Sequence, residues 1–201
     1  MRPRVLRWPA AVLAAILLLA GGYLTGMYRA GRDVPAAGSV DAGFARDMVL
    51  HHGQAVTLAM IIIPRTTTPV VREMAHDIAV TQQREAGEMT GWLEQWGLPT
   101  STTAAPMAWM SHGPTTPTGA DPPMPGMATR ADVARLAVTS GRAADLLFCR
   151  LMLAHHLGGL HMVEEEIARG TRPEVVALAT QMRIDQQREI NLLTALLASH
   201  G

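Results

Sequence analysis

The stretch that decides the fold is DAGFARDMVLHH, residues 41–52, because it returns as DLLFCRLMLAHH at residues 145–156. The two copies share an aspartate, a phenylalanine, a methionine and two adjacent histidines at an offset of 104 residues. The same offset relates QQRE at 82–85 to QQRE at 186–189. Since no insertion or deletion separates these pairs, the chain is a duplication of one unit whose polar residues stay in register.

The composition narrows the class of protein. Hydrophobic residues make up 48% of the 201 residues, aromatic residues only 4%, and 13 residues are methionine. A chain rich in Ala, Leu and Met and poor in aromatic residues favours helices over a β-sandwich. The formal net charge is zero, so the total charge indicates no nucleic-acid partner. The single cysteine, Cys149, cannot form an internal disulfide and is expected to be a small buried apolar residue.

Residues 1–30 are expected to be a membrane anchor or a signal segment. Arginines at 2, 4 and 7 precede an apolar run from Trp8 to Tyr28, which has about the 20 residues that a transmembrane helix requires. The positive-inside rule places the N-terminus in the cytoplasm and the rest of the chain outside the cell membrane. No small-residue cleavage site closely follows the run, so we expect an uncleaved single-pass anchor, with secretion after cleavage as the alternative.

Periodic apolar positions after a linker at residues 31–40 predict four long helices. Their expected ranges are 41–62, 69–96, 142–169 and 172–198, with a short extra helix that begins at Thr129-x-x-Asp132 and ends near Gly141. Thr68 followed by Pro69 is a start signal, and Thr171-x-x-Glu174 predicts a capping box. The acidic run Glu164-Glu165-Glu166 is expected to be a solvated face near a helix end.

The expected architecture is all-α. Short connections predict two antiparallel helical hairpins, repeat 1 at 41–97 and repeat 2 at 129–198, joined by a Pro-, Thr- and Met-rich linker at 98–128. One hairpin alone leaves an apolar stripe uncovered. We therefore expect the repeats to form a single antiparallel four-helix bundle over residues 41–198, preceded by the N-terminal transmembrane or signal helix.

Polar residues occupy inward positions of these helices. At about 100° per residue, Met48 and His51 share the buried face with Phe44, whereas His52 lies on its flank. On the second helix of the hairpin, Gln82, Glu85 and Met89 share one face. An unpaired buried polar group costs about 1–3 kcal/mol, so these side chains need partners, and the hairpin allows the histidines to lie near Gln82 and Glu85.

Two interpretations of this set stay open. In one, it is a structural hydrogen-bond network in which Glu85 orients His51. In the other, which the recurrence favours, it binds a metal ion. The candidate ligands are Met48, His51, His52, Glu85, Met89, Met152, His155, His156, Glu189 and His161. The candidate residues that orient them are Gln82, Gln186, Asp41 and Asp145.

Imidazole and thioether donors favour copper, as Cu(I) or Cu(II). A di-iron bundle uses inward Glu and Glu-x-x-His, which this chain replaces with Gln-x-x-Glu and His-His, so a ferritin-type oxidase is disfavoured. The copies are unequal, because Leu193 stands where the first has Met89. The linker offers a further group that either captures copper or packs over the bundle: Met107, Met110, His112, Met124 and Met127.

These motifs resemble those of domain-of-unknown-function family 305. The family pattern D-x2-F-x3-M-x2-H-H matches Asp41 to His52, and Q-x2-E-x3-M-x2-W-L matches Gln82 to Leu93. Met124-Pro-Gly-Met127 is also similar to the family, and the resemblance covers about residues 39–198. It implies a ferritin-like helical bundle, secreted or membrane-anchored, with copper binding through His and Met in some members.

We therefore expect an extracytoplasmic, membrane-anchored protein that scavenges or carries copper, or confers copper tolerance, through His and Met ligands. We do not expect an enzyme, because nothing in the sequence resembles an activated nucleophile or an acid/base pair on a substrate cleft. One alternative is a helical interaction module whose buried His, Gln and Glu are only structural. The other is a ferritin-like metal-dependent oxidase. The sequence names no protein partner.

Overall fold

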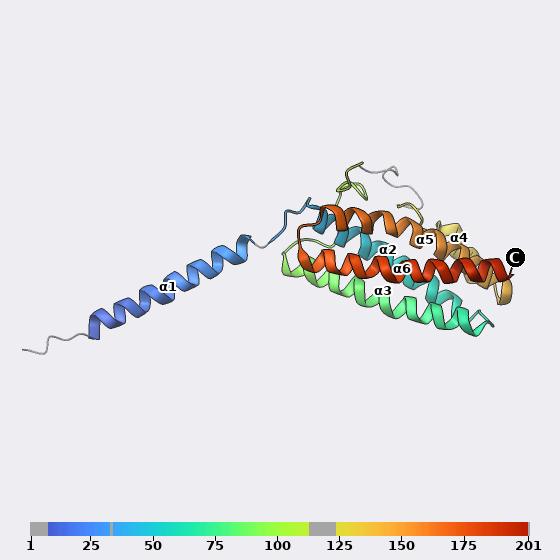
Figure 1. Cartoon of the computed structure of the whole chain (residues 1–201), viewed down its shortest axis with the longest axis horizontal. Coiled ribbons are helices and arrows are strands. Elements are labelled where there is room, and N and C mark those ends of the chain that lie inside the picture. Colours follow the sequence, from blue (N-terminus) through green and yellow to red (C-terminus); the bar gives the residue numbers. More distant parts are fainter. Residues whose placement is uncertain (1–7, 33, 113–123, 201) are drawn as a thin grey trace, which may run out of the picture. The chain divides into compact units, whose positions relative to one another are not determined.

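The computed structural model describes residues 8–32, 34–112 and 124–200, and within these residues every regular element is a helix (Figure 1). The all-α expectation is confirmed. The chain divides into two units, Met1–Pro35 and Ala36–Gly201. The arginines at 2, 4 and 7, on which the expected membrane orientation depends, lie outside the described residues.

The first unit contains one helix, α1 (Trp8–Arg32). Its central part, Ala11–Met27, is apolar, and its leucine side chains are exposed, Leu18 by 77%. In the second unit, α5 (Gly141–Arg169) is long and apolar enough to cross a membrane, but half of its apolar window is buried inside that unit. Burial of this kind is the property of a core helix.

The second unit is built from two hairpins. Helix α2 (Val40–Ile62) packs along α3 (Pro69–Gln95), and α5 packs along α6 (Pro173–His200) (Figure 1). The hairpins meet mainly through α2 and α5, and the short helix α4 (Arg130–Val138) contacts both of these helices. The four long helices and the short one lie where the apolar periodicity predicts them.

The helix starts follow local chemistry at most positions. Ser39 caps α2 by accepting a hydrogen bond from the Ala42 N–H at 3.2 Å. Thr68 precedes Pro69 at the start of α3, and Thr129 and Asp132 form a reciprocal capping box on α4. Thr171 differs from the expectation, because its hydroxyl donates to Asp41 at 2.9 Å while Glu174 accepts from the side chain of Arg172.

The core consists of two clusters. The methionine cluster contains seven methionines among its buried residues: Met48, Met89, Met107, Met124, Met127, Met162 and Met182. The aliphatic cluster is mostly Ala, Leu, Ile and Val, with Phe148, Cys149, Met74 and Met152. Along α2, Met48 belongs to the first cluster and Ala55 to the second, so His51 and His52 lie between them.

The linker between the repeats contributes two straps that pack on the helices. The first strap is residues 98–112 and the second is residues 124–129. Met107, Met124 and Met127 are at most 8% exposed, Met110 packs against the same cluster, and His112 is exposed. Met107, Met124 and Met127 therefore pack in the core over the helices, and copper capture by the linker stays a prediction.

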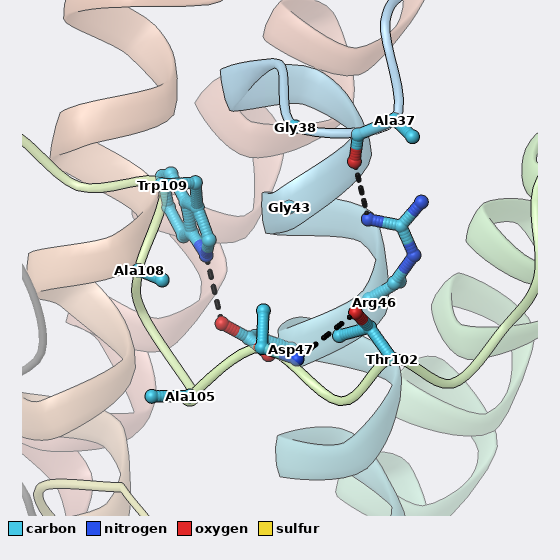
Figure 2. A pocket seen from close by; sticks show the side chains of 10 residues that line it. Ala37, Gly38, Gly43, Arg46, Asp47, Thr102, Ala105, Ala108 and Trp109 are labelled. Carbon is cyan, nitrogen blue, oxygen red and sulfur yellow. Dashed lines mark hydrogen bonds between the residues drawn. The ribbon is translucent and has the colours of Figure 1, made fainter.

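Asp47 and Gly43 hold the first strap on α2 (Figure 2). The Asp47 carboxylate accepts hydrogen bonds from the Met107 N–H at 2.6 Å and from the Trp109 indole N–H at 2.7 Å. Gly43 leaves room for Trp109, because a Cβ there would lie 2.3 Å from the indole ring. Arg46 donates to the carbonyl of Ala37 at 2.7 Å, beside a cavity of about 300 Å³.

The second strap crosses α5 where that helix has two glycines. A Cβ on Gly158 would lie 2.2 Å from the Pro125 carbonyl oxygen, so the strap requires a bare backbone at this point. Gly126 has φ 80°, in the left-handed region that glycine adopts without strain. Gln54 of α2 fixes the end of the strap by bonding both the N–H and the carbonyl of Ala128.

Candidate metal centre

Polar side chains form a layer between the two core clusters. On each long helix they fall between residues of the methionine cluster and residues of the aliphatic cluster. The histidine layer consists of His51, His52, Gln82, Glu85, His155, His156, Gln186 and Glu189. All four histidines are at most 1% exposed, so the layer is enclosed by protein.

Each hairpin contains one histidine–glutamate hydrogen bond. His52 Nε2 lies 2.9 Å from Glu85 Oε2, and both side chains are buried. His156 Nε2 bonds Glu189 Oε2 in the second hairpin, where the glutamate side chain is 21% exposed. An Nε2–H that donates to a carboxylate leaves Nδ1 with its lone pair, and this is how carboxylates orient ligand histidines in metal sites.

The other two histidines meet across the hairpins. The rings of His51 and His155 stack with their centroids 3.7 Å apart and their planes at 32°. His155 Nε2 lies 3.0 Å from the carbonyl oxygen of His51, so it donates that hydrogen bond and leaves Nδ1 as an acceptor. Helix α5 approaches closely here because of Gly159, whose added Cβ would lie 3.1 Å from the His51 ring.

The electrostatic environment keeps these two rings neutral. Burial lowers the pKa of both His51 and His155 well below the ordinary value of 6.5, and the neighbouring histidines lower the pKa further. A neutral imidazole presents a lone pair, which is the form that binds a metal ion. The two groups therefore need no deprotonation before they act as ligands.

Several buried atoms of the layer lack a hydrogen-bond partner among the described protein groups. They are both ring nitrogens of His51, the Nδ1 atoms of His52, His155 and His156, and the Oε1 atoms of Gln82 and Gln186. A buried unpaired polar atom costs about 1–3 kcal/mol, so this many together require an explanation. Within the described part of the chain, no three His, Cys, Asp or Glu side chains already stand in a metal-binding arrangement.

The methionines of the candidate set differ between the repeats. Met48 and Met89 are fully buried in the methionine cluster. Met152 is also fully buried, but it lies in the aliphatic cluster together with Leu193. The first repeat therefore has two buried methionines of the candidate set in the methionine cluster, and the second repeat has one, in the aliphatic cluster.

The structure corrects one expected pairing and one expected burial. Glu85 pairs with His52 and not with His51, because the flank of α2 faces α3 while the inner face meets α5. His52 and His156, which the helical wheel places on the flank, are as deeply buried as His51. The remaining candidates Gln82 and Gln186 are at most 4% exposed and lie in the layer, Gln186 beside Gly159.

Three further candidates lie elsewhere. His161 is exposed on the outer face of α5. Asp41 accepts hydrogen bonds at the start of α6, and Asp145 accepts one from the Thr68 hydroxyl at the start of α3. Both aspartates thus connect one hairpin to the other at the helix ends instead of orienting the histidines. Burial raises the pKa of the Cys149 thiol to about 11, in agreement with a small buried residue.

The burial of one carboxyl group, that of Glu166, was not predicted from the sequence. Glu166 is fully buried, so the expectation of a solvated acidic face is wrong at this position. The signal that could have found it is the duplication, because the residue 104 positions earlier is Ile62, a core residue.

Comparison with known proteins places the chain. The family model described as "Domain of unknown function (DUF305)" matches residues 41–197. A DUF305 protein from Streptomyces coelicolor, described by its name as secreted, is 42% identical and superposes with a TM-score of 0.76, over 83% of this chain and 96% of that one. The Cu(I)-bound form of CopM superposes with a TM-score of 0.62 at 24% identity, over 79% of this chain and 96% of that one, which shows the fold.

A protein of Acanthamoeba polyphaga mimivirus described as uncharacterised is 34% identical over 55 residues, and this chain spans only 36% of its length. The two in-register histidine blocks and the matched range 41–197 cover nearly all of the second unit. On this basis the chain belongs to the DUF305 family.

Proposed function

We propose that this protein binds copper in an extracytoplasmic space and scavenges or carries the ion without catalysing a reaction. The observation that supports this most strongly is the set of buried imidazole nitrogens without a hydrogen-bond partner in one layer. A related protein, CopM, has been solved in Cu(I)-bound and Cu(II)-bound forms. Copper accepts both imidazole and thioether donors. The layer supplies the imidazoles, and Met48 and Met152 of the flanking core clusters are the candidate thioethers.

The residues that would hold the ion are the four histidines, with Met48 and Met152 one turn before each pair. Glu85 and Glu189 serve best as orienting partners, since each already accepts the Nε2–H of a histidine. The neutral state of His51 and His155 removes the proton competition that would weaken binding. Copper is the cargo in this proposal, and the protein supplies donors and exclusion of water.

The remaining parts of the proposal concern fold class and location. We infer that α2, α3, α5 and α6 form a ferritin-like four-helix bundle, on the hairpin pairing described above. We also infer that α1 is a single-pass anchor with its N-terminus in the cytoplasm. The apolar helix Ala11–Met27 with exposed leucines supports this, and secretion after cleavage is the alternative.

A structural role is the competing function, because the His–Glu hydrogen bonds alone can stabilise the interior. A copper titration separates the two. The full chain in detergent is titrated with Cu(I) and with Cu(II), and bound metal is counted by mass spectrometry. We expect the variant with His51, His52, His155 and His156 replaced by Ala to lose binding.

The matched control replaces two exposed histidines, His76 and His161, and should bind as the wild type does. Far-UV circular dichroism shows whether the four-histidine variant is still helical. If a four-histidine variant that is still helical binds as much copper as the wild type, the proposal is wrong. An oxygen-consumption assay with Cu(I) or Fe(II) tests the non-catalytic part, and sustained turnover would count against a passive carrier.

A further inference from the structure

Glu166 is a carboxyl group placed in the core, in the last turn of α5. It is fully buried, and neither of its oxygens receives a hydrogen bond from the described protein groups. The polar side chain that interacts with it is another carboxyl group, that of Asp41 at the start of α2. Two carboxyl groups in contact away from water form a pair that cannot carry two charges without a large cost.

Asp41 is the member of the pair whose oxygens already accept hydrogen bonds from other groups. It accepts hydrogen bonds from the Thr171 N–H at 2.9 Å, the Thr171 hydroxyl at 2.9 Å and the Arg172 N–H at 2.8 Å. All three donors belong to the α5–α6 connection, where unpaired helix N–H groups favour a negative charge. The proton of the pair therefore resides on Glu166, which can donate it to Asp41.

The other charged groups at this end of the helices are engaged with one another. The Arg172 side chain pairs with Glu174 at 2.9 Å and lies over the Trp96 ring. On α5, Glu165 accepts from Arg169 and from Ser111. None of these contacts supplies Glu166 with a counter-charge, and burial followed by Asp41 raises its pKa to about 8.

A metal cation is a poor occupant of this pair. Calcium takes about 6–8 oxygen ligands, and magnesium needs a near-octahedral set with several waters. The oxygens of Asp41 already accept hydrogen bonds from three donors. The described residues contain no group of three or more His, Cys, Asp or Glu side chains that could hold a metal ion. A proton is the cation that fits two carboxyl groups in a closed space.

The surrounding backbone is built around the Glu166 side chain. A Cβ on Gly170 would lie 2.1 Å from Glu166 Oε1 and 2.6 Å from the backbone carbonyl oxygen of Glu166, so the carboxyl group folds back into space that the glycine leaves open. At the equivalent place in the first repeat, 104 residues earlier, Ile62 and Thr66 occupy the two positions. The duplicated fold therefore does not need this carboxyl group, and it is a feature of the second repeat alone.

We propose that Glu166 and Asp41 share one proton and form a pH-sensitive latch between the start of α2 and the α5–α6 connection. With the proton present, Glu166 donates to Asp41, and Asp41 holds the first N–H groups of the connection. When the proton is lost, two buried carboxylates repel each other and the connection loosens. The latch involves neither the histidine layer nor copper, so it stands or falls independently of the function proposed above.

The sign of the pH dependence follows from the raised pKa. The folded chain holds this proton up to a pH of about 8, whereas an exposed glutamate releases it near 4.5. The contribution of the latch to stability is therefore fully present below pH 4.5 and is lost progressively as the pH rises towards 8. Above pH 8 this contribution no longer changes with pH. One proton released on opening changes the opening equilibrium by about tenfold per pH unit in that window.

Hydrogen exchange of the full chain in detergent tests the latch. We measure the protection of the Thr171 and Arg172 amides at pH 6 and pH 8, normalised to the exchange of an unstructured peptide. Wild-type protection is expected to fall by about 50-fold between these values, because Glu166 is half titrated at pH 8. The connection between α2 and α3, at residues 63–68, has no such pair and is expected to keep its protection.

Two substitutions provide matched controls. Glu166→Gln keeps a neutral donor of the same shape, and Glu166→Ile installs the residue of the first repeat, so both are expected to show no fall in protection at Thr171 and Arg172. Their melting temperatures relative to wild type should rise with pH between 6 and 8. A constant difference in melting temperature across that range, or wild-type protection that does not change, overturns the proposal even if one variant fails to fold.

Discussion

The two repeats carry the same histidine pair but surround it differently. In the first repeat Glu85 is 3% exposed, and Met48 and Met89 are both buried in the methionine cluster. In the second repeat Glu189 is 21% exposed, and Leu193 replaces one of the methionines. The duplication has thus kept the polar donors in both halves and has changed what encloses them. If the histidines bind copper, we expect the residues around each histidine pair to determine the copper affinity of that repeat.

Replacing Glu85 and Glu189 one at a time should give the largest difference in the free energy of unfolding between the two repeats. Glu85→Ala leaves the buried Nε2–H of His52 without an acceptor, which we expect to cost about 2–3 kcal/mol of the free energy of unfolding. Glu189→Ala should cost about 1 kcal/mol, because water can reach that side of the pair. Urea unfolding measures both values, with the exposed Glu88→Ala as control. Equal costs for Glu85→Ala and Glu189→Ala would show that the repeats are enclosed alike.

A smaller effect is expected from the first strap, which is held on α2 by Asp47 and also reaches Glu165 of α5 through Ser111. At position 43 the first repeat has glycine, whereas the second has Leu147 at the same offset. Gly43→Ala places a methyl group in the space of the Trp109 ring and should cost about 1–3 kcal/mol as the strap moves away. Limited proteolysis within residues 98–112 should then become faster.

Gly53→Ala on the same helix is the matched control for the strap, because nothing lies within 4 Å of its added Cβ. This substitution should stabilise the helix by about 0.5–1 kcal/mol, since alanine has the better helix propensity. If Gly43→Ala behaves like Gly53→Ala, Trp109 is not held against α2 in the way the structure shows.

The helices could be predicted from the sequence because their signals are local. Apolar periodicity and the start signals at Thr68 and Thr129 depend on neighbouring residues, and the structure has helices at those places. The linker could not be predicted in the same way. Met107 has φ 63°, a left-handed conformation that is uncommon for methionine, and it is held there by Asp47, 60 residues earlier in the chain.

The histidines, glutamines and glutamates of the layer could be picked out from the sequence, but which of them pair could not. A helical wheel gives the direction in which each side chain leaves its own helix. It does not show which neighbouring helix lies in that direction. His51 and His52 are adjacent in sequence, yet one meets His155 of the other hairpin and the other meets Glu85 of its own. The pairing depends on how far neighbouring helices are shifted along each other. The spacing of residues along one helix does not determine this shift.

The smallest change in stability, and the sharpest test of the comparison, comes from Leu193→Met. Leucine and methionine have similar volumes, so we expect the exchange to cost less than about 1.5 kcal/mol. The new thioether would give the second repeat the ligand types of the first. Cu(I) should then bind about tenfold more tightly, while Cu(II) affinity changes little, because thioether is a soft donor that prefers Cu(I). Competition with a Cu(I) chelator measures the change, and Met89→Leu, which makes the first repeat like the second, should shift Cu(I) affinity in the opposite direction. If both variants leave Cu(I) affinity unchanged, the methionines are core residues only, and any copper bound by the layer is held by the histidines alone.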